Sequence, residues 1–120
     1  MITGLRGTTT WSENLDNLLP FYRDLLGLAV VIQIPGFAVL GTPGGPAVAL
    51  GTHSGVRGRN MDPARHMVGL GSDDVDGDHK RLTAAGVEFV EPPTDYGQLR
   101  IATLKDPEGN LIQLLQPIGG

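Results

Sequence analysis

Apolar residues in the first half of the chain occur in short runs with two different periods. Between residues 13 and 26 they recur every three or four positions, which predicts an amphipathic helix. Pro20 lies inside this helix and should bend it or leave one hydrogen bond open, and Gly27 is well placed to end it. Short apolar or alternating runs predict strands around the helix, at residues 5–11, 29–34, 37–40 and 47–51.

The second half of the chain repeats this order of elements. A strand at residues 66–71 precedes a helix at residues 75–85, which Gly86 should end. Three further strands are predicted near residues 87–91, 99–104 and 111–116. The 120 residues therefore read as a single domain with module one at about 1–52, a linker at about 53–65 and module two at about 66–120.

Two segments also repeat in sequence. Residues 71–76 resemble residues 11–16, at an offset of 60, and both place polar helix-capping residues after an extended segment. Residues 106–114 resemble residues 42–50, at an offset of 64, with a proline turn, a glycine and an apolar strand. The two matches favour a duplicated unit. We therefore predict an α+β fold in which two tandem βαβββ modules form a curved mixed sheet, with helices outside and a concave ligand cleft inside.

Composition excludes several classes of protein. Hydrophobic residues make up 40% and charged residues 18%, as in a globular domain. The net charge is −4, and the only cluster of arginines lies in the glycine-rich linker, so we expect no nucleic-acid partner. The absence of cysteine excludes disulfides and thiolate chemistry. No apolar run approaches the roughly 20 residues that cross a bilayer, and no leader pattern opens the chain, so we expect a cytoplasmic protein without a membrane partner.

Four segments in chain order carry a family resemblance. Residues 18–28 read LLPFYRDLLGL, residues 84–89 read AAGVEF, residues 96–100 read YGQLR, and residues 106–114 read DPEGNLIQL. Together they resemble the vicinal-oxygen-chelate superfamily, also called the glyoxalase/bleomycin resistance/dioxygenase family. The resemblance implies the paired βαβββ fold and a homodimer. Members include isomerases, lyases, dioxygenases and metal-free drug-binding proteins, so the resemblance leaves the activity open.

The resemblance also implies positions for a divalent metal ion. Metal-using members place His, Glu or Gln on inward-facing strand positions. Here those positions hold Gly7, His66 (or the neighbouring Met67) and Gln113. Glycine offers no ligand atom, and a neutral amide is a poor ligand for a hard cation. We therefore expect no cofactor, and the alternative is a divalent metal ion with His66 and Gln113 as weak candidate ligands.

Six side chains are predicted to contact a ligand: Thr9, Trp11, His66, Tyr96, Arg100 and Gln113. Trp11 would stack on a planar group if it faces inward, with a core or dimer-seam position as the alternative. Gln113 would form a hydrogen bond, or else be a satisfied buried amide. Arg100 would pair with an anionic group, or else form a surface ion pair with Asp95 or Glu91.

The predicted function follows from the inward-facing positions, which are mostly small or apolar. They favour a metal-free protein that holds a small apolar or aromatic ligand in the cleft. The alternatives are a metal-dependent lyase, isomerase or extradiol-type dioxygenase that uses His66, and an interaction module whose cleft is filled by its own side chains. Motifs for nucleotide binding are missing from the sequence, because the glycine-rich turn at residues 41–45 has no lysine and no following helix.

Overall fold

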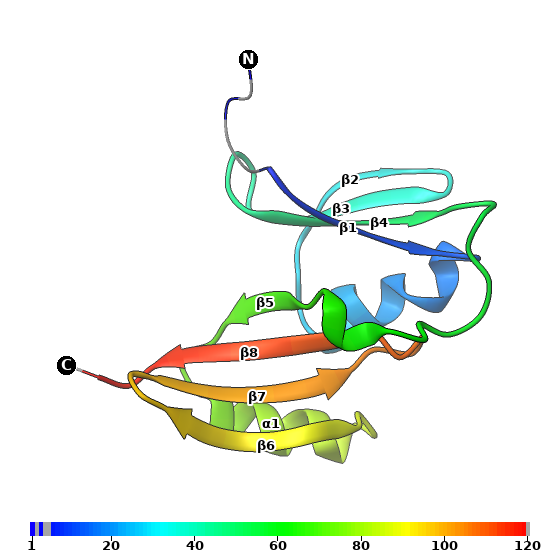
Figure 1. Ribbon diagram of the computed structural model, residues 1–120. Helices are drawn as coiled ribbons and strands as arrows, with labels where there is room; N and C mark the ends of the chain where they lie inside the picture. The colour runs from blue at the N-terminus through cyan, green and yellow to red at the C-terminus, as the bar shows by residue number, and fades with distance from the viewer. Residues whose placement is uncertain (2, 4–5, 120) are drawn as a thin grey trace. The chain divides into compact units, whose positions relative to one another are not determined.

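The computed structural model describes residues 1, 3 and 6–119, which form two compact units, Met1–Gly58 and Arg59–Gly120. Each unit contains one four-stranded mixed sheet (Figure 1). The strand order is β1-β4-β3-β2 in the first and β5-β8-β7-β6 in the second. In both sheets the first pair of strands is parallel and the other pairs are antiparallel. The predicted duplication of one α+β unit is therefore confirmed.

The first unit contains β1 (Gly7–Ser12), β2 (Val30–Ile34), β3 (Phe37–Gly41) and β4 (Ala47–Thr52). Residue 5, where the first predicted strand begins, lies outside the described residues. Alternate side chains of β3 and β4 are buried, as expected for strands with one covered face. They form the core of the unit together with residues of the helical segment: Leu15, Leu18, Leu19, Tyr22, Ala38, Leu40, Val48 and Leu50.

The helical segment of the first unit is irregular, so the prediction of one continuous helix at residues 13–26 is wrong. It consists of a short 3-10 turn, η1 (Leu15–Asn17), and a π-helical turn, η2 (Phe21–Leu25). Pro20 immediately precedes η2 and has no N–H to donate. The next bonds therefore change spacing, and the Leu26 N–H donates to the Phe21 carbonyl at 3.0 Å. The predicted disturbance at Pro20 is confirmed, but it extends over the whole segment.

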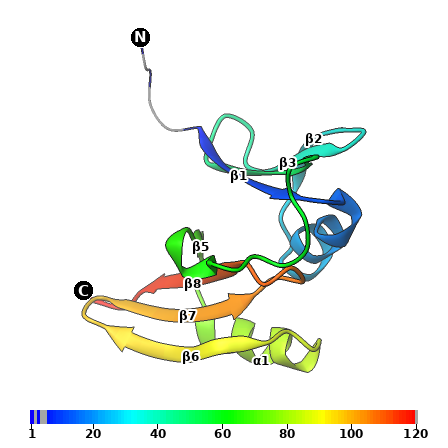
Figure 2. The same ribbon diagram turned by 45° about the vertical axis from the view of Figure 1, so that its right-hand side comes forward.

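The second unit contains β5 (Val68–Gly71), α1 (Val75–Ala84), β6 (Phe89–Tyr96), β7 (Leu99–Lys105) and β8 (Leu111–Pro117). The Asp74 carboxylate caps α1 by accepting from the Gly77 N–H at 3.0 Å. Gly86 follows the helix with a φ of +89°, a conformation that favours glycine. Figure 2 shows α1 against one face of this sheet, where the unit buries its apolar side chains: Val75, Leu82, Ala102, Leu104, Ile112 and Leu114.

Two strand boundaries that bear on the candidate site differ from those predicted. β5 begins at Val68 rather than His66, because Pro63–Arg65 form a 3-10 turn, η3, that His66 closes. β6 continues to Tyr96 rather than ending near Glu91, although it contains two prolines. Proline is tolerated there because β6 is an outer strand and its pairing with β7 is irregular at the prolines.

The two units also share a capping contact, which lies at positions related by the sequence repeat. In each unit, a side chain at the end of the last strand accepts a hydrogen bond from the backbone at the start of the helical segment. The Leu15 N–H donates to Thr52 Oγ1 at 2.9 Å, and the Val75 N–H donates to Gln116 Oε1 at 2.8 Å. These pairs are related by the same offsets of 60 and 64 residues. Among the described residues, no helix is long and apolar enough to cross a membrane.

Candidate ligand-binding faces

In each unit the helical segment covers one face of the sheet, and we call the other the open face. Strand register assigns residues to it, because directly paired residues point to the same side. In the first unit, Trp11 pairs with Gly51, which pairs with Phe37. The neighbouring row consists of Thr9, Ala49 and Val39. The predicted ligand-contacting residues Thr9 and Trp11 therefore lie on the same open face.

Trp11 lies across Gly51. A Cβ atom at Gly51 would lie 2.5 Å from Cζ3 of the indole and 3.0 Å from Cδ1 of Phe37, so only glycine leaves room for the ring. The Trp11 ring centroid is 6.1 Å from that of Phe37 and 5.4 Å from that of His53. We call Trp11, Phe37 and His53 the aromatic cluster. Trp11 remains 42% exposed, so a planar molecule has indole surface to stack on.

His53 adds a polar edge to this cluster. Its Nδ1 accepts a hydrogen bond from the Gly55 N–H at 2.9 Å, so the proton of the neutral ring is on Nε2. Nε2 is then a hydrogen-bond donor beside the indole. Neither Phe37 nor His53 was predicted as a site residue. Phe37 had a usable signal in its alternation with Ala38, whereas His53 lies just beyond its strand and has none.

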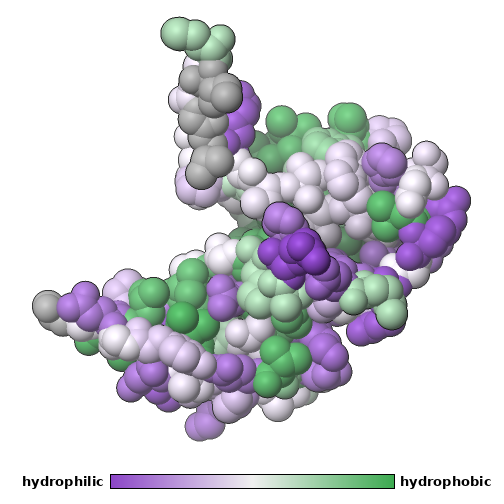
Figure 3. Space-filling model, in the orientation of Figure 1, coloured by the Kyte–Doolittle hydropathy of each residue, from purple (hydrophilic) through white to green (hydrophobic). Residues whose placement is uncertain are grey.

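Apolar side chains extend the first open face onto β2. Ile34 pairs with Phe37 and Ile32 with Val39, so both isoleucines point to the open side. They are 56% and 53% exposed, and Figure 3 shows hydrophobic atoms at the surface over β2 and β3. The open face of the first unit is therefore aromatic and aliphatic, with few polar groups.

The open face of the second unit carries a polar row. Gly69 pairs with Gln113, Gln113 with Thr103, and Thr103 with Glu91. Gln113 is half-buried, and its side-chain amide forms no hydrogen bond with any described residue. Its amide is thus open to a ligand.

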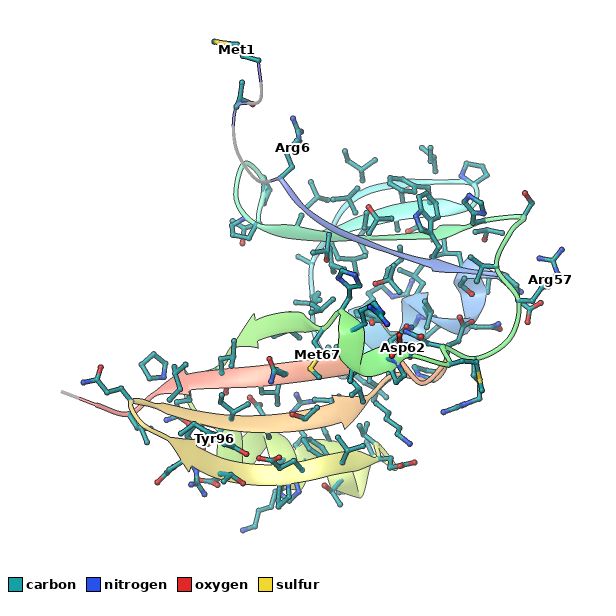
Figure 4. All side chains as sticks on the ribbon, in the orientation of Figure 1. Met1, Arg6, Arg57, Asp62, Met67 and Tyr96 are labelled. Atoms are coloured by element: carbon teal, nitrogen blue, oxygen red, sulfur yellow. The ribbon has the colours of Figure 1, made fainter. Side chains whose placement is uncertain are left out.

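Tyr96 joins this row through Glu91. The phenol donates a hydrogen bond to Glu91 Oε1, and this bond raises the pKa of Tyr96. Figure 4 shows the Tyr96 side chain on this sheet. Tyr96 and Gln113, both predicted to contact a ligand, therefore share the open face of the second unit.

Arg100 lies on the other side of the same sheet. It donates to Asp76 of α1 at 2.9 Å and to Asp95 of β6 at 2.7 Å. These hydrogen bonds, first the one to Asp76 and then the one to Asp95, raise the pKa of Arg100 further above its usual value. The side chain ties the helix to the sheet and is not brought together with Gln113.

His66 is also not brought to the polar row. It is exposed and precedes β5 by two residues. The pairing of β5 with β8 is continuous from Val68 to Gly71, so no bulge within it turns His66 toward Gln113. By alternation, the residue that shares the side of Gly69 is Met67, labelled in Figure 4 just ahead of β5.

The side chains present do not fit the divalent metal site that the family resemblance implies. The implied positions carry Gly7, Met67 and Gln113, and the counterpart of Gln113 in the first unit is Ala49. A hard divalent cation needs several oxygen or imidazole ligands, and this set supplies one neutral amide. Within residues 1, 3 and 6–119, no group of three or more His, Asp or Glu side chains is placed to hold a metal ion.

Comparison with known proteins decides the family. The profile of the Glyoxalase/Bleomycin resistance protein/Dioxygenase superfamily matches residues 8–114. The chain belongs to this superfamily. A curated relative, the uncharacterized protein YurT of Bacillus subtilis, is 41% identical over 47 residues. That match spans 39% of this chain and 37% of YurT, so the chain covers about a third of that relative's length.

Solved structures of other proteins share the fold over nearly the whole chain. A superfamily member from Sphaerobacter thermophilus is 27% identical, with a TM-score of 0.75, over 96% of this chain and 98% of its own. TnmS3, an antibiotic binding protein from a Streptomyces species, is 25% identical, with a TM-score of 0.76, over 97% of each chain. One structural neighbour of the chain is thus an antibiotic binding protein.

Proposed function

We propose that this protein binds a small, flat, apolar or aromatic molecule on the open face of its first unit, without the metal ion used elsewhere in the superfamily. The observation that carries this proposal is the indole of Trp11 lying over Gly51. Because Gly51 has no side chain, the aromatic ring of Trp11 can lie along the surface of the sheet.

The physical case rests on exposed apolar area. Trp11, Ile32 and Ile34 are between 42% and 56% exposed on one face, and covering such area is worth about 25 cal/mol per Å². Stacked aromatic pairs add roughly 0.5–1.5 kcal/mol beyond the area term. Phe37 and His53 flank the indole and limit its movement, so a ligand loses little free energy in ordering it. The antibiotic-binding neighbour TnmS3 supports a ligand of this kind.

Fluorescence provides the test, because Trp11 is the single tryptophan. Titration with phenazine, a flat neutral tricyclic probe, should quench Trp11 in a saturable way. Calorimetry on Trp11→Leu should show the affinity falling at least about fivefold, in line with the loss of one stacked pair. Tyr96→Leu, on the open face of the second unit, is the matched control and should bind phenazine normally. If the unmodified protein showed no quenching and no heat of binding with phenazine, the proposal would be refuted.

The metal-free part of the proposal has its own measurement. Purified protein should contain no stoichiometric Ni, Zn, Mn or Fe by elemental analysis. A full equivalent of any of these ions that survives desalting would overturn this part and favour the lyase, isomerase or dioxygenase alternative.

We also propose that the protein is a homodimer, as the superfamily resemblance implies. Sedimentation at micromolar concentration should give about twice the chain mass of 12.7 kDa. A single species at the chain mass would contradict the proposal.

A further inference from the structure

We infer that the polar row of the second unit, Glu91, Thr103 and Gln113, is a subsite for a positively charged hydrogen-bond donor, such as a protonated amine. This inference goes beyond the proposed function, because it assigns the second unit, taken by itself, a ligand group of a defined chemical class. Four observations support it.

The first observation is how Glu91 and Tyr96 come to share the open face. β6 advances three residues from Glu91 to Thr94, while its partner β7 advances two, from Thr103 to Ile101. The extra residue is a bulge at Pro92 and Pro93, and it reverses the alternation of side chains beyond it. Glu91 and Tyr96, five residues apart, therefore point to the same side. Without the bulge they would lie on opposite faces of the sheet.

The second observation is that the partner of Glu91 is neutral, whereas six other carboxylates pair with cations. Six aspartates and glutamates of the described residues form ion pairs with arginine or lysine: Asp24, Asp62, Asp76, Asp78, Asp95 and Glu88. Glu91 instead accepts the Tyr96 phenol on Oε1, and no described cation pairs with it. Its other oxygen is left to accept a hydrogen bond from outside the protein.

The third observation is orientation. The Tyr96 phenol can donate only one proton, and it holds one carboxylate oxygen in a fixed position. A carboxylate held in this way loses less conformational entropy when a ligand binds. Tyr96 is therefore a positioning residue for Glu91.

The fourth observation is the chemistry of the row. A carboxylate only accepts hydrogen bonds, a threonine hydroxyl both donates and accepts, and the Gln113 amide does both. Directly paired residues have Cβ atoms about 4.5–5.5 Å apart, so neighbouring side chains of the row can bind one small group together. The row favours donors over acceptors and cations over anions. An ammonium group, with three donors and one positive charge, matches it best.

Three small probes with one ring and different charges test the inference: benzylamine, benzyl alcohol and benzoate. Each is titrated into isotopically labelled protein, and binding is followed through the side-chain amide signal of Gln113. Benzylamine should bind about tenfold or more tightly than benzyl alcohol, the usual advantage of a charge-assisted hydrogen bond, and benzoate should bind most weakly.

Variants then locate the preference. Glu91→Gln keeps the size and the acceptor for Tyr96 but removes the charge, and it should abolish the preference for benzylamine. Glu88→Gln makes the same chemical change at a residue already paired with Lys105, and it should leave the preference intact. Tyr96→Phe should keep the preference but weaken benzylamine binding by about two- to threefold, because Glu91 keeps its charge and loses its orientation.

Each remaining outcome overturns the inference. Equal affinities for the three probes would show that the row does not select charge. An equal loss in Glu88→Gln and Glu91→Gln would show a general effect of the negative surface. Either result, with phenazine still quenching Trp11, refutes the amine subsite alone. If neither phenazine nor any of the three probes binds, the proposed function fails, and the subsite fails with it.

Discussion

The open faces of the two units have the same strand register, but they carry different side chains at equivalent positions. In the first unit the inner strand β4 carries Gly51, and the outer strand β1 lays Trp11 over it. At the equivalent positions of the second unit the outer strand β5 carries Gly71, and the inner strand β8 carries Leu115. The glycine and the bulky residue have thus exchanged strands. One duplicated backbone therefore presents an aromatic surface in one unit and a polar row beside aliphatic side chains in the other.

The helix-covered faces of the two units have not diverged in this way. Both bury alternate aliphatic residues, and both cap the helical segment from the last strand. This contrast separates stability from recognition. Residues that hold the helical segment against the sheet are constrained by packing in both units, whereas residues on the open face are not under this constraint.

The largest expected effect tests this division within one strand. Ile112 is fully buried under α1, and Ile112→Ala should lower the free energy of unfolding by about 2–5 kcal/mol. Val48, its counterpart in the first unit, is 4% exposed, and Val48→Ala should cost less because fewer methyl groups are removed. Gln113→Ala, on the open side, should change stability by less than about 0.5 kcal/mol. Urea unfolding measures all three, and a large loss in Gln113→Ala would contradict the division between faces.

A smaller loss of stability is expected when alanine replaces Gly51. Gly51→Ala places a methyl group 2.5 Å from the indole of Trp11, and overpacking of this kind costs about 1–3 kcal/mol. The displaced ring should also shift the fluorescence maximum of Trp11. Gly71→Ala is the matched control, because a Cβ atom there meets nothing within 4 Å. If both substitutions were equally harmless, Trp11 would not depend on Gly51 for its position.

A still smaller effect is expected at Arg100. Arg100→Gln removes ion pairs to Asp76 and Asp95 that lie at the surface, so stability should fall by less than it does in Gly51→Ala. Binding of benzylamine and phenazine should not change, because Arg100 lies on the face that α1 covers. If the variant folded normally but lost affinity for either probe, Arg100 would count as a ligand-binding residue after all.

The sequence predicted the duplicated βαβββ unit well, because alternation and capping are local signals. Gly86 and Asp74 mark the ends of α1 in the sequence as they do in the structure. The irregular helical segment around Pro20 was harder, because a proline shows that a helix is disturbed but not how far the disturbance extends. The β6 bulge could not be predicted, because two consecutive prolines normally argue against a continuing strand.

The candidate site was predictable only where side-chain direction followed alternation. Thr9, Trp11 and Gln113 were placed on open faces by that rule, and the structure agrees with it. Arg100 lies on the covered face and His66 lies outside its strand, because both depend on element boundaries rather than on period. Glu91 was considered as an ion-pair partner of Arg100 and not as a ligand-binding residue, and its contact with Tyr96 depends on the bulge.

The smallest expected effect is at the metal position, where a single acidic residue should change almost nothing. Gln113→Glu restores the carboxylate that the superfamily resemblance implies, but its neighbours in the row are Gly69 and Thr103, and Met67 adds no strong ligand for a hard cation. One carboxylate leaves a divalent ion mostly coordinated by water, so binding should stay weak. The variant should therefore retain no Ni or Zn after desalting, as measured by elemental analysis. Gln113→Ala is the baseline in the same measurement. If Gln113→Glu alone held a full equivalent of metal, the second unit would contain further ligands, and the loss of the metal site would be confined to one position.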